Sequence, residues 1–342
     1  MTRGHPARLV VVVAACVIGS IQPAPAWWSG GHAIAARTGA GALPKDVPAF
    51  FRHSREALAE FSAEPDVWKN RAAPHLDNAE WPEHFMDWEL LAGRALPPLR
   101  WDYAALCADL RLNPHNVGLL PYAIAEWTER LTLAFAEYRR SPGDSAVQHK
   151  CLVYGGILAH YAADLAQPLH LTVSYDGRTS PGAPSPHTGI HDRMDALLQA
   201  ARLQTRAIAS EIKPVAFGDV FTSTVREITL NREEIDTVYA LEADLPVVSR
   251  GQRVDPNWRP TERIHQLAMD RAREAAFVTA SCWLTAWGHS AGIALRGPTH
   301  AGAAAETPGR YSPVLVLVVI AVAGLVLFLS AYRLGKRVAG GG

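Results

Sequence analysis

The stretch His160-Tyr-Ala-Ala-Asp164-Leu-Ala-Gln-Pro-Leu-His170 decides how this chain is interpreted. The stretch begins inside a long apolar helical pattern that covers residues 148–166 and extends four residues past its end. Because residues four apart share one face of a helix, His160 and Asp164 are expected to point the same way. Pro168 disfavours helix at the residue before it, so His170 is expected just past the helix end, turned back toward that face. Imidazoles and a carboxylate gathered in this way are typical ligands of zinc.

A second pair, His191-Asp-Arg-Met-Asp195, repeats the four-residue spacing. Two His/carboxylate pairs together with His170 are more ligands than one zinc ion needs, since zinc usually takes four. No Cys-x-x-Cys motif exists, so any metal is expected to rest on His and carboxylate side chains. An exposed ion pair at helical spacing is the alternative for His191 and Asp195. The sequence therefore predicts a cluster of several metal ions.

The body of the chain has helical periodicity almost throughout, which predicts an all-α fold with one large domain. Only residues 171–175 have the pattern of a short strand, and residues 176–186 are rich in Gly, Ser and Pro and are expected to form a loop. The predicted helices cover residues 116–140, 145–166, 189–212, 233–245 and 261–287.

The two ends of the chain differ from the body. Residues 1–26 have the basic, apolar and small-residue parts of a secretory signal, with cleavage expected after Ala26. A lipoprotein-type cleavage before Cys16 is the rival interpretation. Residues 295–312 have the composition of a flexible linker, and residues 313–332 lie in an uncharged apolar run long enough to span a membrane. The basic tail, residues 333–342, is then expected in the cytoplasm and the body, residues 27–294, outside it, in the periplasm or at the cell surface.

The overall charge narrows the possible functions. The 342-residue chain has a formal net charge of zero. This balance argues against a general nucleic-acid coat and against a polybasic membrane patch, but it leaves room for an enzyme that holds a phosphodiester with metals. Three of the four cysteines follow the signal segment, so at most one disulfide can form within the mature chain.

Four blocks of sequence together resemble the superfamily that joins zinc-dependent phospholipases C with secreted single-strand-specific nucleases. The order of the blocks matches and the resemblance spans residues 27–287. The blocks are Trp27 followed by His32, then Asp66, then His84-Phe-Met-Asp87, then His160 to His170 with the final His191-x-x-x-Asp195.

The resemblance implies three zinc ions, with ligands carried over residue by residue. One zinc is expected on Asp66, His84, His160 and Asp164. A second is expected on His170, His191 and Asp195. The third is expected on the free amine and carbonyl of Trp27 with His32 and Asp164, so that Asp164 bridges two ions. Asp66 and Asp164 are thus the predicted catalytic residues, around a water acidified by zinc that attacks phosphorus.

The resemblance leaves the substrate open between single-stranded nucleic acid and phospholipid. Asp195 at the last ligand position, the long segment from His170 to His191 and the Tyr175-Asp-Gly element favour a nuclease. Met194 before the last Asp and the small number of cysteines depart from the nuclease pattern. Phe85 and Asp87 are the predicted substrate-binding residues, with core packing as the alternative for Phe85. A non-catalytic protein that uses zinc only to hold its helices together is a third interpretation.

Overall fold

The computed structural model describes residues 27–249 and 253–295. The predicted signal segment, Cys16, the linker from residue 296 onward, the predicted span and the basic tail lie outside these residues. Among the helices within the described ranges, none is both long and apolar enough to cross a membrane.

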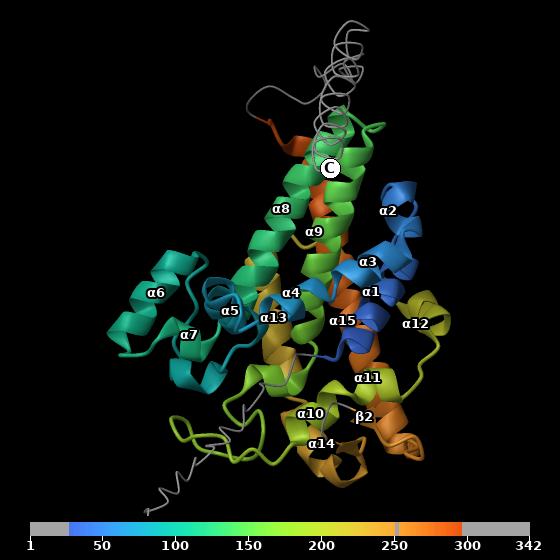
Figure 1. Cartoon of the computed structure of the whole chain (residues 1–342). Coiled ribbons are helices and arrows are strands. Elements are labelled where there is room, and N and C mark those ends of the chain that lie inside the picture. The colour runs from blue at the N-terminus through green and yellow to red at the C-terminus, as the bar shows by residue number, and fades with distance from the viewer. Residues whose placement is uncertain (1–26, 250–252, 296–342) are drawn as a thin grey trace, which may run out of the picture. The chain divides into compact units, whose positions relative to one another are not determined.

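Three long helices form the centre of the molecule (Figure 1). They are α8 (Leu120–Arg140), α9 (Ser145–Asp164) and α15 (Glu262–His289), and each packs against the other two. Helix α1 (Ser29–Ala42) packs against α15 and α9, and α13 (Val220–Arg232) packs against α8. The prediction of an all-α fold is confirmed for the described residues, where the strands are limited to the short antiparallel pair β1 (Val248–Ser249) and β2 (Arg253–Val254).

Shorter helices surround this centre. On the N-terminal side of α8 they are α2 (Ala49–His53), α3 (Arg55–Phe61), α4 (Glu64–Trp68), α5 (Pro74–Glu80), α6 (Arg100–Asp109) and α7 (Pro114–Val117), with the 3-10 turns η1 (Trp81–His84) and η2 (Trp88–Leu91). After α9 they are η3 (Pro168–Leu171), α10 (Ile190–Asp195), α11 (Leu197–Ala200), α12 (Thr205–Glu211), α14 (Ile235–Ala240), η4 (Glu242–Asp244) and, after α15, η5 (Ser290–Gly292).

Three of the predicted elements differ from the structure. The helix expected over residues 233–245 is limited to α14 and the separate turn η4. The helix expected over residues 189–212 is broken into α10, α11 and α12, with Arg202 in the left-handed region at φ 51° between the last two. The strand expected over residues 171–175 does not form, because these residues follow η3 directly and continue into turns. Helix α13 lies in a segment for which the sequence analysis predicted no helix.

Small residues let helix α3 approach α9 closely. Helix α9 begins after a turn at Asp144, whose carboxylate accepts hydrogen bonds from the backbone N–H groups of Ala146 and Val147. A Cβ built on Gly155 would lie 2.6 Å from the ring of Phe51 on α2 and 3.0 Å from Cδ2 of Leu58 on α3, and one on Gly156 would lie 2.4 Å from the Cβ of Phe61 on α3. Glycine at both positions therefore allows the close contact that brings the end of α3 beside the C-terminal half of α9.

A continuous apolar core fills the space between the long helices. Phe51 and Trp283 are fully buried and meet edge to face at 5.3 Å between ring centroids, and the indole of Trp283 donates a hydrogen bond to the carbonyl of Gly155. Full burial of one such aromatic side chain stabilises a fold by about 1.5–3 kcal/mol. These contacts fix α9, and with it the residues that α9 carries.

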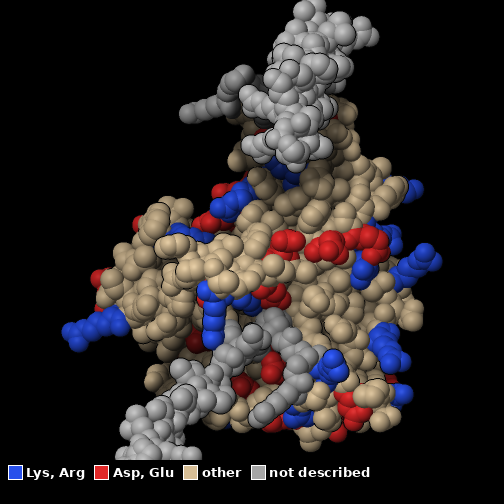
Figure 2. All heavy atoms as spheres, in the orientation of Figure 1, with Lys and Arg blue, Asp and Glu red and all other residues tan. Residues whose placement is uncertain are grey.

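The surface and the cysteines agree with the composition. Over the part of the face in Figure 2 that described residues form, acidic and basic side chains are scattered among uncharged ones without a continuous basic stripe. Cys107, Cys151 and Cys282 are free and buried, so none of them uses the single disulfide that the count allows.

Candidate metal centre

Helix α9 presents two of the predicted ligands from its buried face. His160 and Asp164 are fully buried, and Nε2 of His160 lies 3.3 Å from Oδ2 of Asp164. The helix ends at Asp164, and Pro168 begins the turn η3. This turn brings Nδ1 of His170 to 3.5 Å from Oδ1 of Asp164, which is the reversal that the proline predicts.

The predicted side-chain ligands gather into three groups. Within each group, the atoms able to bind a metal lie within 4.8 Å of one another. The groups are His32 with His160 and Asp164, Asp66 with His84 and His160, and His170 with His191 and Asp195. The structure thus brings together every side chain that the family resemblance implies as a zinc ligand. These side chains come from helices and turns between residues 32 and 195.

Asp164 stands between two of the groups. Its Oδ1 lies 3.5 Å from Nε2 of His32, and its Oδ2 lies 3.0 Å from Nδ1 of His84. A carboxylate can hold a different cation on each oxygen, whereas one imidazole nitrogen cannot. The two oxygens of Asp164 therefore face imidazoles of two different ligand groups.

The two imidazoles of the second group face each other nitrogen to nitrogen. Nε2 of His160 and Nδ1 of His84 are 2.9 Å apart, while Nδ1 of His160 is 2.7 Å from the carbonyl oxygen of Ser62. A carbonyl only accepts, so Nδ1 of His160 carries the proton and Nε2 presents its lone pair. The close approach of α3 and α9 thus sets the tautomer that leaves Nε2 available to a metal.

Trp27 is fixed beside the centre through its side chain. The indole is fully buried and donates a hydrogen bond of 2.8 Å to the carbonyl of Ala163. The backbone N–H of Trp28 donates to the carbonyl of Asp195 at 3.2 Å. The side-chain group that contains His32 consists of His32, His160 and Asp164. The ring of His160 stacks on that of His32, with 3.7 Å between the ring centroids. The amine of Trp27 becomes available as a ligand only if residues 1–26 are removed.

Several buried ligand atoms make no hydrogen bond within the described residues. They include both ring nitrogens of His32, Oδ1 of Asp164, Nδ1 of His170 and Oδ2 of Asp195. Buried polar atoms are almost always hydrogen-bonded, and an unsatisfied one requires an explanation such as a bound ion. A set of imidazole nitrogens and carboxylate oxygens within a few ångströms fits zinc, and these residues therefore fit the predicted ions.

Burial disfavours the charged forms of the groups in this centre. Desolvation lowers the pKa values of His32 and His84 well below the ordinary value and lowers the pKa of His170 to about 4. Desolvation raises the pKa of Asp195 to about 7 and also raises the pKa of Asp164. The imidazoles of His32, His84 and His170 are therefore neutral, as ligands must be. Desolvation opposes the charged form of His160, but Asp164 and Asp66 outweigh it and raise its pKa. The raised pKa values of Asp164 and Asp195 mean that these carboxyl groups need a nearby cation to be ionised.

Lys69 is a residue of the centre that the sequence analysis missed. Its ammonium lies 2.7 Å from Oδ1 of Asp66, and its side chain is only 7% exposed. Its positive charge contributes to lowering the pKa values of His84 and His170. The only signal in the sequence is its spacing. Asp66 lies in helix α4, and Lys69 follows directly after the end of this helix, three residues later.

Glu80 and Tyr161 form a second contact that the sequence analysis missed. Oε1 of Glu80 lies 3.2 Å from Nε2 of His84, on the opposite side of the ring from Asp164. The hydroxyl of Tyr161 donates a hydrogen bond to the same carboxylate. Burial raises the pKa of Glu80 to about 7. The carboxylate thus lies behind His84, where outer-shell partners of metal-binding histidines usually lie.

The predicted substrate-binding residues lie on a short extended segment next to His84. The backbone N–H groups of Met86 and Asp87 donate to the carbonyls of His170 and Val117, and Met86 pairs with Gly118 in an isolated bridge. A Cβ on Gly118 would lie 2.1 Å from the carbonyl oxygen of Phe85, and φ is +103°, so this approach requires glycine.

The side chain of Met86 belongs to the core, but those of its two neighbours are only half-buried. Phe85 and Asp87 both have intermediate exposure. Burial, with a smaller contribution from Glu89, raises the pKa of Asp87 to about 7. Neither residue belongs to the three ligand groups. The chain therefore keeps a carboxyl group in an unfavourable environment beside the centre, which is a feature of functional sites.

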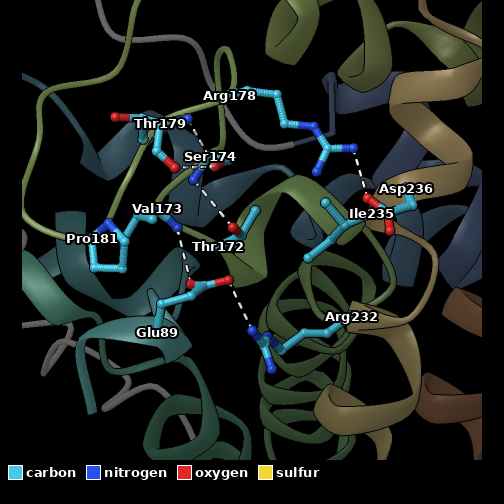
Figure 3. A pocket seen from close by; sticks show the side chains of 10 residues that line it. All are labelled: Glu89, Thr172, Val173, Ser174, Arg178, Thr179, Pro181, Arg232, Ile235 and Asp236. Carbon is cyan, nitrogen blue, oxygen red and sulfur yellow. Dashed lines mark hydrogen bonds and ion pairs between the residues drawn. The ribbon is translucent and has the colours of Figure 1, made fainter. Parts of the chain in front are cut away.

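A separate pocket of about 320 Å³ opens beside residues 172–174. Figure 3 shows its two arginines, and each is matched by a carboxylate: Arg178 by Asp236 at 2.6 Å and Arg232 by Glu89 at 2.8 Å. The pocket contains none of the predicted metal ligands. Its charges are already balanced, so it offers less to a phosphate than the metal centre does.

Among solved structures, two clostridial toxins overlap with this chain. The alpha-toxin of Clostridium perfringens from avian strain SWCP matches with a TM-score of 0.38 and 16% identity, over 80% of this chain and 67% of the toxin. The alpha toxin from Clostridium absonum matches with a TM-score of 0.37 and 15% identity, over 81% and 68%. No protein-family model and no curated protein matches the chain. Overlaps of this extent carry no functional argument, so the assignment of function rests on the side chains.

Proposed function

We propose that this chain is a zinc-dependent phosphodiester hydrolase. The observation that carries the proposal is the convergence of eight predicted side-chain ligands, from His32 to Asp195, into three neighbouring groups of buried and partly unsatisfied atoms. The expected ions are three zincs, with Asp66, His84, His160 and Asp164 around the first, His170, His191 and Asp195 around the second, and Trp27, His32 and Asp164 around the third.

Zinc bound in such a centre supplies a Lewis acid and an acidified water at neutral pH. The residues of the chain would contribute the rest. Asp164 would keep two ions at a fixed separation, and Asp66 would orient the attacking water. The ammonium of Lys69, held at 2.7 Å from Asp66, would offer a fixed positive charge to a phosphate oxygen.

Within the described residues the cysteines do not offer an alternative nucleophile. Cys107, Cys151 and Cys282 are buried, and desolvation raises the pKa values of Cys151 and Cys282 to about 12. A thiol is nucleophilic as the thiolate, which these environments disfavour. This supports a mechanism that depends on the metal centre.

Single-stranded nucleic acid is the substrate class that we propose first. The rings of Tyr175 and His191 lie 5.7 Å apart between centroids, and burial, with a smaller contribution from Asp87, raises the pKa of the Tyr175 hydroxyl. An aromatic ring and a carboxyl group close to the metal centre suit a base, which can stack and donate hydrogen bonds.

Phospholipid is the second candidate, and a specific observation favours it. Trp101 is 82% exposed and Leu99 is 65% exposed, which is unusual for a large aromatic next to a large aliphatic side chain. Arg100 between them binds both oxygens of Glu83, the neighbour of His84, at 2.5 and 3.0 Å. An exposed tryptophan in such a rigid corner suits the interface of a lipid layer.

We also propose that the domain is exported and tethered. Removal of residues 1–26 would leave Trp27 with a free amine, and residues 313–332 would hold the domain at a membrane. The composition of both ends supports this arrangement.

Hydrolysis of bis-p-nitrophenyl phosphate with and without chelator tests the activity. We expect turnover that the chelator removes and zinc restores; bound zinc without turnover would favour the purely structural role. Single-stranded DNA, RNA and phosphatidylcholine assayed in parallel then separate the two substrate classes.

A matched pair of variants tests the centre itself. We expect Asp164→Ala to lose zinc and activity together, because this carboxylate touches two ligand groups. His265→Ala, which removes an exposed histidine of α15, should keep both. An Asp164→Ala protein with its full zinc content would contradict the bridging role.

A further inference from the structure

Gln167 belongs to the most distinctive stretch of the sequence, yet the zinc scheme gives it no role. It lies in the turn between α9 and η3 and is fully buried. Its backbone N–H donates to the carbonyl of Asp164, and its own carbonyl accepts from the N–H of His170, both at 3.0 Å. The backbone of one residue thus joins a ligand on the helix to the ligand on the turn.

The side chain of Gln167 reaches in the other direction. Its Oε1 accepts a hydrogen bond of 2.8 Å from the backbone N–H of Leu169. Its Nε2 donates a hydrogen bond of 2.7 Å to Oδ1 of Asp195, on helix α10. A backbone N–H can only donate, so the amide oxygen must face Leu169 and the NH2 group must face Asp195.

This orientation distinguishes the two oxygens of Asp195. Oδ1 receives the hydrogen bond from Gln167. Oδ2 is buried, makes no hydrogen bond within the described residues and lies 3.6 Å from Nδ1 of His191. Oδ1 also lies 3.6 Å from Nε2 of His170. The carboxylate is therefore turned so that each oxygen faces one imidazole of its ligand group, and Oδ2 is the oxygen without a hydrogen bond.

We propose that Gln167 is a positioning residue for the zinc on His170, His191 and Asp195, an inference that rests on the proposed metal centre. One amide caps the turn that places His170 and at the same time fixes the rotation of the Asp195 carboxylate. A long segment separates His170 from α10. The hydrogen bond from Gln167 to Asp195 therefore fixes the position of α10 relative to the turn that carries His170. Partners of this kind orient the ligands and raise the affinity for the ion.

Two variants separate the two halves of this role. Gln167→Met keeps the length of the side chain and removes both hydrogen bonds. Gln167→Glu keeps an oxygen for Leu169 but places a second carboxylate against Asp195. If Gln167 only capped the turn, Gln167→Glu would bind zinc as the wild type does.

The experiment measures zinc directly, without relying on activity. Zinc per chain and affinity are measured by chelator competition at pH 8 on the full chain, and the visible spectrum of the cobalt-substituted protein reports the coordination. We expect both variants to hold one of the zinc ions about 10–100-fold more weakly and to change one component of the cobalt spectrum.

Asn231→Leu is the matched control. Asn231 is also a buried amide, but it joins α13 to Glu274 and Arg271 and contacts none of the predicted ligands. It should lower stability and leave zinc affinity and the cobalt spectrum unchanged.

Two outcomes would overturn the proposal, and they differ. Wild-type affinity and spectrum in both Gln167 variants would overturn the role of Gln167 alone. A wild-type chain that binds no zinc would overturn the metal centre with it. If Gln167→Met does not fold, Gln167→Glu still decides, because it retains the cap on Leu169.

Discussion

The indole of Trp27 donates a hydrogen bond to the carbonyl of Ala163, the residue directly before Asp164. This contact joins the start of the described chain to the C-terminal end of α9. The neighbouring Trp28 donates to the carbonyl of Asp195, so the same segment also reaches α10. The first two described residues therefore lie against the ends of α9 and α10, the helices that carry Asp164 and Asp195.

The first prediction concerns the free amine of Trp27. A chain that begins at Trp27 should bind one more zinc ion than a chain that retains Ala26, because a peptide nitrogen is a much poorer ligand than an amine. Metal analysis of the two purified proteins checks this. Both should keep the other ions, since the indole contact is the same in each; equal zinc contents would contradict the proposed third site.

The second prediction concerns Asp176 in the loop before α10. Its Oδ1 accepts from the backbone N–H of Gly189 at 2.7 Å and of His191 at 3.4 Å. Asp176→Ala should lower the free energy of unfolding by about 1 kcal/mol, the usual effect of losing such a cap, and should loosen the loop. Urea denaturation and limited proteolysis of residues 176–189 measure the two effects.

Asp236→Ala serves as the comparison for that loop. Asp236 pairs with Arg178, but its side chain is 85% exposed, and exposed pairs contribute little. We expect stability and proteolysis close to those of the wild type. A loop that is cut equally fast in both variants would argue against the clamping role of Asp176.

The third prediction concerns the close contact of α3 and α9. Gly156→Ala should lower the free energy of unfolding by about 1–3 kcal/mol, because the added methyl group would lie 2.4 Å from Phe61. Gly143→Ala adds a methyl group with nothing within 4 Å and should be close to neutral. If instead Gly156→Ala stabilises the protein, as alanine usually does within a helix, the contact is looser than described.

The fourth prediction uses the buried carboxyl of Asp87. Its pKa is about 7 in the fold, against about 3.9 when unfolded, so the native state binds more protons between these pH values. The contribution of Asp87 to stability therefore decreases as pH rises from about 4 to 7. Asp87→Asn removes this term and should stabilise the protein relative to the wild type more at pH 8 than at pH 4.

Urea denaturation of both proteins over this pH range, with chelator present throughout, measures the difference. A difference in stability that stays constant with pH would show that Asp87 is ionised freely in the fold. Lower affinity for substrate in the same variant would link the unfavourable burial to binding.

Local sequence spacing was enough to predict the heart of the centre. His160 and Asp164 share a face because α9 is a regular helix, and Pro168 forces the turn that brings back His170. Lys69 could have been found in the same way, since it follows Asp66 at helical spacing. The helix expected from residue 189 to 212 failed because its apolar pattern continues through Arg202, where the backbone turns left-handed.

Contacts between distant segments were beyond such reasoning. Glu80 meets Tyr161, and Ser62 meets His160, only because α3, α5 and α9 pack together, and no local pattern encodes that packing. The role of Gln167 could not be predicted from the sequence either. The residue stands in a recognisable motif, but its partner, Asp195, is defined by the fold rather than by the spacing.

The free and buried state of Cys107, Cys151 and Cys282 has a consequence for the maturation of the protein. Within the described residues no disulfide links distant segments, so a reducing agent should leave this part of the fold intact. The links between its distant segments would be metal ions instead of disulfides. Supply of the metal during folding would then decide how firmly the finished molecule is held together.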